Sequence, residues 1–443
     1  MTMEKTGRKM GATSLFFMLA GTMIGPSIVL YVGYAIASTG FSAWVALILG
    51  MSVGLFLYAP LFFVSSAIKL RGGEYSIVAA MGGRKLAGVY AYCSLPTYIG
   101  ISSLAVGAGS YIHAVFPNVG VNVAAATVAT VFFVLNILGI RSLSKAQNAL
   151  TITLFLCLLM YVAFGITKIN QPIFNFSGPE FFTNGGAGLF AAVGIMSGMG
   201  QTVKYAVSYT DLAEDPKKNI PLTMIKVPVA LMILYLLVCI VSEGVLPLSE
   251  TAGKVLTVQA GYLMPKTLVA VFILFGPVMA LMTSLNGFFT GMGMPIVTNA
   301  RNGWFPKFLM DKNRFDAYWK TMIVLYIICI FPIATGMSLT KIVQNGFILA
   351  AATGYTMIIC LFRFPKLYPE AWAQARFKVP NAVYYVFCTL SFIAETFIVI
   401  YSVSSLSITN VIINLVIIVV FAVAGVMRSK SENVEVASAI SVD

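Results

Sequence analysis

Charged residues are scarce in this sequence. Only 10% of its 443 residues are Asp, Glu, Lys or Arg, and 59% are hydrophobic, whereas ordinary soluble domains carry roughly 25% charge. No charge occurs in four long blocks, residues 10–68, 86–140, 267–300 and 396–427. Because about 20 helical residues cross the hydrocarbon of a bilayer, each block is long enough for one or two transmembrane helices.

Residue types that support catalysis or metal binding are also few. The chain has one His and six Cys, and the cysteines lack the paired spacing of a zinc site or a redox motif. The sequence shows no nucleophile–base pair, no phosphate-binding loop and no cluster of metal ligands. We therefore expect no catalytic residue, no metal and no cofactor, and we expect that the protein is not an enzyme.

The apolar blocks divide at their turn-forming residues into twelve predicted transmembrane helices. A closed barrel would need short alternating strands, whereas these segments are continuously apolar, so helices are favoured. The expected spans are residues 11–37, 41–67, 86–113, 121–140, 147–167, 186–210, 222–246, 267–298, 320–338, 342–362, 381–403 and 407–427.

The formal charge is +13, and the distribution of the basic residues along the chain fits the predicted membrane topology rather than a nucleic-acid-binding surface. Most Lys and Arg fall in alternate loops, and the other side carries only Lys168, Lys254, Lys266 and Lys341. The positive-inside rule then places both termini in the cytoplasm. We expect a multi-pass protein of the plasma membrane, the inner membrane of a bacterium, with the lipid bilayer and not nucleic acid as its surroundings.

Glycine clusters interrupt two of the predicted helices, in residues 21–27 of the first span and residues 194–202 of the sixth. Glycine and proline weaken helices, so both segments are expected to unwind within the membrane, as the paired interruptions of a transport site do. An offset of five spans gives equivalent helices opposite orientations and predicts two inverted repeats. The open alternative is that these glycines let helices pack closely.

The predicted organisation is therefore a single membrane domain. The membrane domain covers residues 11–428 and contains a first repeat (about 11–167), a second repeat (about 186–362) and two extra helices (about 381–427). Residues 1–10 form a cytoplasmic N-terminus, and residues 429–443 form a disordered cytoplasmic tail.

Five stretches, in order, resemble one family. They are Gly21-Thr-Met-Ile-Gly-Pro-Ser-Ile28, Gly72-Gly-Glu-Tyr75, Asn136-Ile-Leu-Gly-Ile-Arg141 with Gln147-Asn148, Asp215-Pro-Lys-Lys-Asn-Ile-Pro221 and Ala300-Arg-Asn-Gly-Trp-Phe-Pro-Lys307. Over most of its length the chain resembles the amino acid, polyamine and organocation (APC) superfamily of transporters. The resemblance implies a LeuT-like fold, all α, of five plus five inverted helices with two appended, and amino acids or related amines as substrates.

The resemblance also implies where the substrate binds. In the family, backbone groups of the broken first helix hold the substrate carboxylate, and carbonyls of the first and sixth helices hold its amino group. The corresponding residues here are Thr22, Ile24, Gly25, Pro26, Ser27, Ile28, Ser197, Gly198, Gly200, Gln201 and Thr202. Pro26 departs from the family pattern and removes one N–H donor, although the Ser27 hydroxyl offers a replacement, so a substrate with a different or missing carboxylate stays open.

Lys204 follows the sixth-helix break directly, at a position where the family more often has an aromatic or aliphatic residue. An ammonium in the membrane costs about 2.5–3.5 kcal/mol on insertion scales, so it should face a cavity or a partner. Two interpretations stay open: a group that binds substrate or a proton, or a lysine that reaches toward the cytoplasm or pairs with Asp211. Glu395, in the eleventh span, is interpreted as a structural or interface carboxylate, and a coupling site is the alternative that stays open.

Other polar residues inside spans are weaker candidates. Tyr98, Ser102, Thr283 and Ser284 either line the cavity or form hydrogen bonds between helices. Leu154 occupies the expected position of the family's coupling lysine, so coupling through that residue is unsupported.

The predicted function is a secondary transporter, a permease or exchanger, that moves an amino acid or close analogue by alternating access. Exchange, facilitated diffusion and a coupling proton all stay open. A polyamine or organic amine antiporter and a substrate sensor that does not transport are the alternatives.

Overall fold

The computed structural model describes residues 10–70, 73–138, 142–291, 293–436 and 440–441. Of residues 25–27, 142–150, 283, 287, 290, 291, 440 and 441 it describes only the helix or strand to which they belong.

Helices make up nearly all of the described chain. In the first half they are α1 (Ala12–Thr39), α2 (Ala43–Leu57), α3 (Ala59–Ala67), α4 (Glu74–Thr97), α5 (Ile101–Val115), α6 (Val121–Ile137), α7 (Ser142–Gly165), α8 (Gly185–Gln201) and α9 (Pro216–Gly244). In the second half they are α10 (Leu248–Thr251), α11 (Thr257–Leu263), α12 (Lys266–Ile273), α13 (Met279–Gly291), α14 (Gly293–Arg301), α15 (Trp319–Ala334), α16 (Leu339–Leu367), α17 (Pro369–Ala373), α18 (Asn381–Ser405) and α19 (Ile408–Arg428).

Shorter elements join these helices. They are the 3-10 helices η1 (Gly40–Ser42), η2 (Tyr98–Gly100), η3 (Ile166–Lys168), η4 (Thr202–Leu212) and η6 (Lys307–Met310), the π-helical turn η5 (Leu274–Val278), and the strands β1 (Lys69–Leu70) and β2 (Ile440–Ser441).

The helices are as apolar as the sequence predicts. Among the described residues, nine segments are long and apolar enough to cross a membrane, and three shorter apolar helices are Ala12–Ile24, Val121–Ile137 and Trp319–Ala334. A spanning helix satisfies its backbone hydrogen bonds internally, which an irregular chain in lipid does not. The expectation of a multi-pass helical membrane protein is therefore confirmed.

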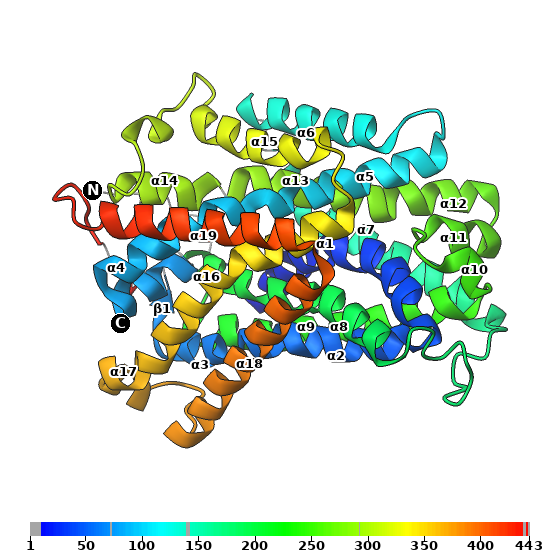
Figure 1. Ribbon diagram of the computed structural model, residues 1–443, viewed down its shortest axis with the longest axis horizontal. Coiled ribbons are helices and arrows are strands. Elements are labelled where there is room, and N and C mark those ends of the chain that lie inside the picture. Colours follow the sequence, from blue (N-terminus) through cyan, green and yellow to red (C-terminus); the bar gives the residue numbers. More distant parts are fainter. Residues whose placement is uncertain (1–9, 71–72, 139–141, 292, 437–439, 442–443) are drawn as a thin grey trace.

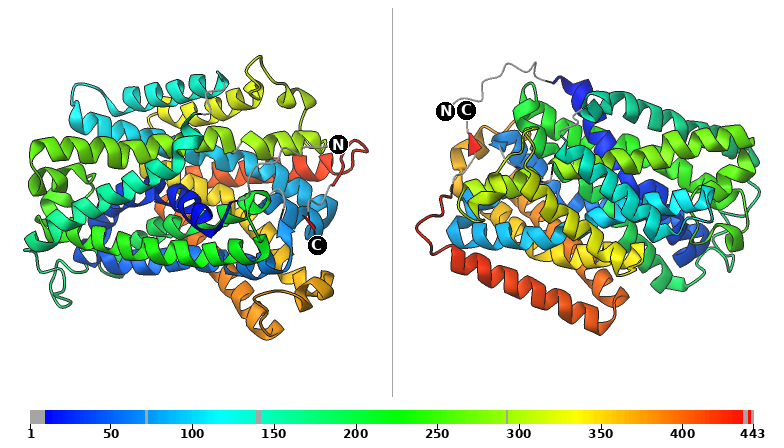
Figure 2. Two further views of the ribbon diagram at one scale, coloured as in Figure 1. Left: turned by 180° about the vertical axis from the view of Figure 1, so that it is seen from behind. Right: turned by 90° about the horizontal axis from the view of Figure 1, so that it is seen from above.

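The helices form one bundle with different structures at its two ends. The short helices α10 and α11 lie at one end, whereas β1, the start of α4 and α17 lie at the other (Figure 1). Helix α19 runs along the outer edge of the bundle (Figure 2), and its apolar side chains Ile408, Val419 and Met427 are exposed. An exposed apolar face of this kind suits contact with lipid.

The sixth predicted span is interrupted, but later than expected. Helix α8 continues through the glycines of residues 194–200, and the helix type changes at Thr202, where the 3-10 helix η4 of 11 residues begins. Runs of 3-10 helix longer than three or four residues are uncommon and often mark a hinge or strain. The predicted unwinding of residues 194–200 is therefore wrong, and the interruption lies directly after them.

Close helix packing explains why these glycines stay helical. A Cβ at Gly200 would overlap the Met51 carbonyl oxygen, and a Cβ at Gly54 would overlap the Ser197 carbonyl oxygen. The missing side chains let α2 and α8 approach each other closely, which is the packing alternative left open above. Helix α1 runs without a break from Ala12 to Thr39, so the predicted unwinding of residues 21–27 in the first span is wrong as well.

The C-terminal tail, expected to be disordered, is packed over its described residues 429–436. Val434 is only 4% exposed, and the Arg84 guanidinium donates to the carbonyl oxygens of Val434, at 3.0 Å, and Ser431. Further along, the Glu435 N–H donates to the Asn302 carbonyl oxygen at 3.0 Å. The expectation was wrong there because a polar segment can be fixed by donors from the helix ends around it. Strand β2 then pairs with β1 in antiparallel fashion.

The close approach of α2 and α8 predicts opposite effects for two glycine substitutions. Gly54→Ala should lower the thermal unfolding temperature in detergent, because overpacking costs roughly 1–3 kcal/mol. Gly261→Ala is the matched control, because Gly261 is also helical but a Cβ there meets nothing within 4 Å. It should be neutral or stabilising. Equal unfolding temperatures for the two variants would contradict this packing.

The packed tail predicts a length threshold. A chain that ends at Lys430 should unfold at a lower temperature than wild type, because it loses several backbone acceptors worth roughly 0.5–1.5 kcal/mol each. A chain that ends at Val436 keeps these contacts and should lie closer to wild type. Fluorescence-detected unfolding of the purified proteins measures the order, and two truncations that both match wild type would refute it.

Candidate functional site

An ion pair forms beside the interruption of the sixth span. Lys204 belongs to the first turn of η4, and its Nζ lies 3.4 Å from Oε2 of Glu74, the first residue of α4. The two side chains are 24% and 19% exposed. The pair thus connects two segments that are distant in the chain, and it satisfies the expectation that a lysine at this place needs a partner. That partner is Glu74 and not Asp211.

The local backbone explains how Glu74 reaches this position. Gly73, directly before it, has φ 68°, which glycine adopts without the steric cost that other residues incur. A second turn of this kind occurs at Gly83, where φ is 71° and α4 is kinked. Gly73 thus lets α4 begin with Glu74 beside Lys204, and Gly83 lets the helix change direction further along.

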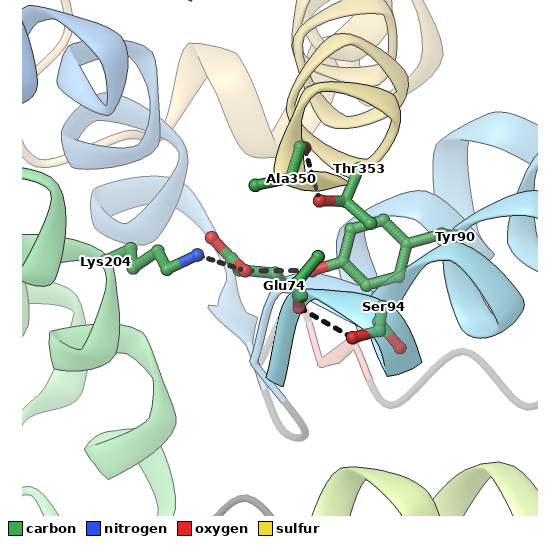
Figure 3. Close-up of polar contacts among 7 residues, drawn as sticks. Glu74, Tyr90, Ser94, Lys204, Ala350 and Thr353 are labelled. Carbon is green, nitrogen blue, oxygen red and sulfur yellow. Dashed lines mark hydrogen bonds and ion pairs between the residues drawn. The ribbon is translucent and has the colours of Figure 1, made fainter. Parts of the chain in front are cut away.

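Aromatic residues surround the ion pair. The Tyr90 hydroxyl donates to Glu74 Oε2 at 2.8 Å, so Glu74 lies between Lys204 and Tyr90 (Figure 3). Lys204 Nζ also lies 5.4 Å from the ring centroid of Tyr58 and 5.7 Å from that of Tyr205. These distances allow cation–π attraction, which compensates part of the cost of removing the ammonium from water.

A small cavity adjoins the ion pair. Its volume is about 30 Å³, and its lining includes Glu74, Lys204, Gln201, Phe347 and Glu395. A single water needs at least about 10–15 Å³ measured in this way, so the cavity has room for about two waters and none for an amino acid. A substrate can therefore enter this place only when helices or side chains around it move.

Glu395 is the second carboxyl at the cavity. It belongs to α18 and is only 4% exposed. The sequence favours a structural or interface carboxylate outside the repeat core, with a coupling site as the alternative, and in the structure Glu395 lines the same cavity as Lys204 and Glu74. The cavity thus has one basic and two acidic side chains, contributed by η4, α4 and α18.

Two of the expected site residues, Gln201 and Lys204, line this cavity. A Cβ at Gly198 would lie 3.3 Å from the ring of Phe347, another lining residue, and 3.2 Å from that of Tyr31. Gln201 Nε2 lies 3.3 Å from Ser197 Oγ and donates to it. Of the expected residues, those at the end of α8 are the ones that lie nearest to the cavity.

The other expected residues are distributed among helix contacts. Thr22 and the Tyr209 hydroxyl lie 2.8 Å apart, and Ser102 donates to the Cys329 carbonyl oxygen at 2.8 Å, which links two helices. Among the remaining ones, Thr202 donates to the Met199 carbonyl oxygen at 3.2 Å, Ile24 and Ile28 are fully buried, Tyr98 is buried, and Gly200 packs against Met51.

Ser284 is a special case, because its hydroxyl is buried and no hydrogen-bond partner occurs for it within the described part of the chain. The side chains of Gly25, Pro26, Ser27 and Thr283 lie outside the described residues.

Glu74, Tyr58 and Tyr90 were missed as site residues. Glu74 was visible as the acidic residue of the Gly72-Gly-Glu-Tyr75 stretch, but the expected third span began only at residue 86. A search for acidic partners near the ends of the spans, and not only inside them, would have found it.

Comparison with known proteins agrees with the resemblance in the sequence. The sequence model of a family described as amino acid permease matches residues 10–435. The branched-chain amino acid permease BcaP of Bacillus subtilis (strain 168) is 21% identical over 267 residues, which cover 56% of this chain and 57% of that relative. The match thus spans a little over half of the relative's length. Since the family model covers nearly the whole chain, the protein belongs to the amino acid permease family, a family of transporters and not of enzymes.

Proposed function

We propose that this protein is a secondary transporter that moves an amino acid or a close analogue across the plasma membrane by alternating access. The observation that carries the proposal is the Lys204–Glu74 ion pair at the junction of α8 and η4, beside a cavity too small for a substrate. Membership of the amino acid permease family supports the substrate class.

The proposed architecture has twelve transmembrane helices in a single domain. Helices lie at every one of the expected ranges, with α2 and α3, α8 and η4, and α12 to α14 each forming one span. Residues 11–167 and 186–362 are the two inverted repeats, and α18 and α19 are the appended helices. The 3-10 helix that follows α8 supports a substrate site there, because interrupted helices form the substrate sites of such folds.

The proposed orientation places both termini in the cytoplasm of a bacterium. The end of the bundle that holds β1, the start of α4 and α17 (Figure 1) also holds the packed tail with Arg84 and Arg428. Concentration of Lys and Arg at one end supports a cytoplasmic position for it. The opposite end, with α10 and α11, then faces outward.

The charges of the cavity favour a substrate that carries an amino group. Two carboxyls and one ammonium leave an excess of negative charge when both carboxyls are ionised, which attracts an ammonium from the substrate. A branched-chain amino acid is the first candidate, since the relative's name records that class. An organic amine or polyamine is the second candidate, because the same excess charge suits a cation without a carboxylate.

The ion pair is proposed to open and close during transport. Lys204 and Glu74 belong to different segments, so separation of η4 from α4 breaks the pair and widens the cavity toward the end of the bundle at which α4 begins. A paired and partly buried charge costs little, whereas one left alone costs several kcal/mol. The pair therefore stabilises the closed arrangement, and the free energy of substrate binding has to compensate for breaking the pair.

Counterflow in proteoliposomes tests the function. Vesicles are preloaded with one unlabelled amino acid or amine, and uptake of the labelled compound is measured with protein-free vesicles as control. We expect uptake of at least one amino acid at several times the control, with the branched-chain compounds tested first. No uptake of any amino acid or amine would refute the transporter proposal and leave binding without transport.

The ion pair predicts which substitutions disturb the cycle. Lys204→Met leaves Glu74 without its cation and should lower the initial uptake rate about tenfold or more, equivalent to roughly 1.4 kcal/mol or more. Lys204→Arg keeps the charge and should retain more activity. The Lys204→Met/Glu74→Gln double variant removes both charges and should lose less than the sum of the single losses.

A second lysine ion pair supplies the control for these variants. Lys320 Nζ, in the first turn of α15, lies 2.6 Å from Oδ2 of the exposed Asp311, and pairs near the surface contribute about 0–1 kcal/mol. Lys320→Met should therefore transport like wild type. If Lys204→Met also did so, the ion pair would have no part in the transport cycle.

A further inference from the structure

The Glu395 carboxyl has no partner at the cavity. Within the described part of the chain, no hydrogen bond or ion pair reaches it, although it is 96% buried and lines the cavity of Lys204 and Glu74. Nearby, Lys204 pairs with Glu74 and not with Glu395. Burying an unpaired charged group costs free energy, so we expect a ligand that neutralises the carboxylate.

The packing around Glu395 fixes the carboxyl in place. Gly354 of α16 lies against it, and a Cβ at that position would overlap Oε1 of Glu395. One turn before Glu395 on α18, Ser391 donates to the Leu57 carbonyl oxygen. Directly after Glu395, the Oγ1 of Thr396 lies 3.0 Å from the Tyr355 hydroxyl. The carboxyl is thus held between α16 and the turn after α2 rather than free to swing into solvent.

Four titratable groups face Glu395 from the elements around it. Lys204 comes from η4, Glu74 and Tyr90 come from α4, and Tyr58 comes from the turn between α2 and α3; all of them line the cavity. From α16 the cavity is lined by apolar side chains, Gly354 and Thr353, and Thr353 donates to the Ala350 carbonyl oxygen at 2.7 Å. Because Lys204 is paired with Glu74, it compensates a negative charge on the buried Glu395 only in part.

A proton fits this site better than a metal ion. The cavity offers a single uncommitted carboxyl, whereas metal ions take several oxygen ligands. A proton needs one oxygen and no space. The small volume of the cavity likewise leaves no room for a substrate molecule beside Glu395.

We propose that Glu395 is the proton-binding residue through which a proton is coupled to transport, an inference that rests on the transport function proposed above. While Lys204 is paired with Glu74, Glu395 holds the proton and is neutral. When the pair opens, Lys204 moves to Glu395, the carboxyl O–H bond breaks, and the proton passes to water. Glu74, at the beginning of α4, is then exposed to water and keeps its charge hydrated.

Uptake driven by an imposed pH gradient tests the proposal. Purified full-length protein in proteoliposomes is assayed between about pH 5 and pH 8.5, with and without the gradient and at constant sodium. Wild type should show severalfold changes of the initial rate with pH and should accumulate substrate when the gradient is imposed. Glu395→Gln should give a flat pH profile near the acidic limit of wild type and no accumulation driven by the gradient.

Two further variants keep the test specific. Glu395→Asp retains a titratable carboxyl and should retain a pH-dependent rate. Glu243→Gln is the matched control, since Glu243 is a fully buried carboxyl of α9 that does not line the cavity; it should keep the wild-type pH profile. A pH indicator in weakly buffered detergent solution should detect proton exchange on addition of substrate to wild type, and none with Glu395→Gln.

Several results would overturn the inference. One is an initial uptake rate of Glu395→Gln that still depends on pH. Another is a wild-type uptake rate that depends on sodium and not on pH. A third is an uptake rate of Glu243→Gln that has also lost its pH dependence. Absence of counterflow in wild type would instead refute the transport function itself. The two failures are therefore distinguishable in the same vesicles.

Discussion

The constraint on which this structure depends is the cost of a charge inside an apolar bundle. Lys204 stands where the sixth span changes from α-helix to 3-10 helix, and its ammonium needs compensation there. Glu74 supplies the opposite charge, and Tyr58, Tyr90 and Tyr205 supply a hydrogen bond to Glu74 and aromatic faces. The arrangement of η4, the beginning of α4 and the turn after α2 follows from that requirement.

Much of the fold could be predicted from the sequence because the bilayer restricts it. Continuous apolar blocks leave the helix as the way to satisfy the backbone, so helices occur at all the expected ranges. Short elements at the ends of the bundle, such as α10, α11 and β1, were not predicted. At the ends of the bundle, water can satisfy backbone hydrogen bonds, so the requirement for a helix is weaker and tertiary contacts decide the conformation.

The glycine clusters show where a sequence pattern is ambiguous. Gly200 belongs to a glycine-rich segment that was expected to unwind, yet it remains helical. Its missing side chain leaves space for the Met51 carbonyl oxygen of α2. Whether a glycine breaks a helix or packs it closely depends on a neighbour far away in the chain. The same holds for Lys204: its charge predicted a partner, and the turn at Gly73 at the beginning of α4 places Glu74, from a distant segment, beside it.

The central claim is that the Lys204–Glu74 ion pair is made and broken as the cavity closes and opens. Solid-state NMR of the protein in lipid, with labelled Lys and Glu, measures the dipolar coupling between the Nζ of Lys204 and the carboxyl carbon of Glu74, assigned by its loss in Lys204→Met. The account predicts a clear coupling without substrate that weakens when a transported amino acid saturates the protein. A coupling that persists unchanged at saturating substrate would contradict it.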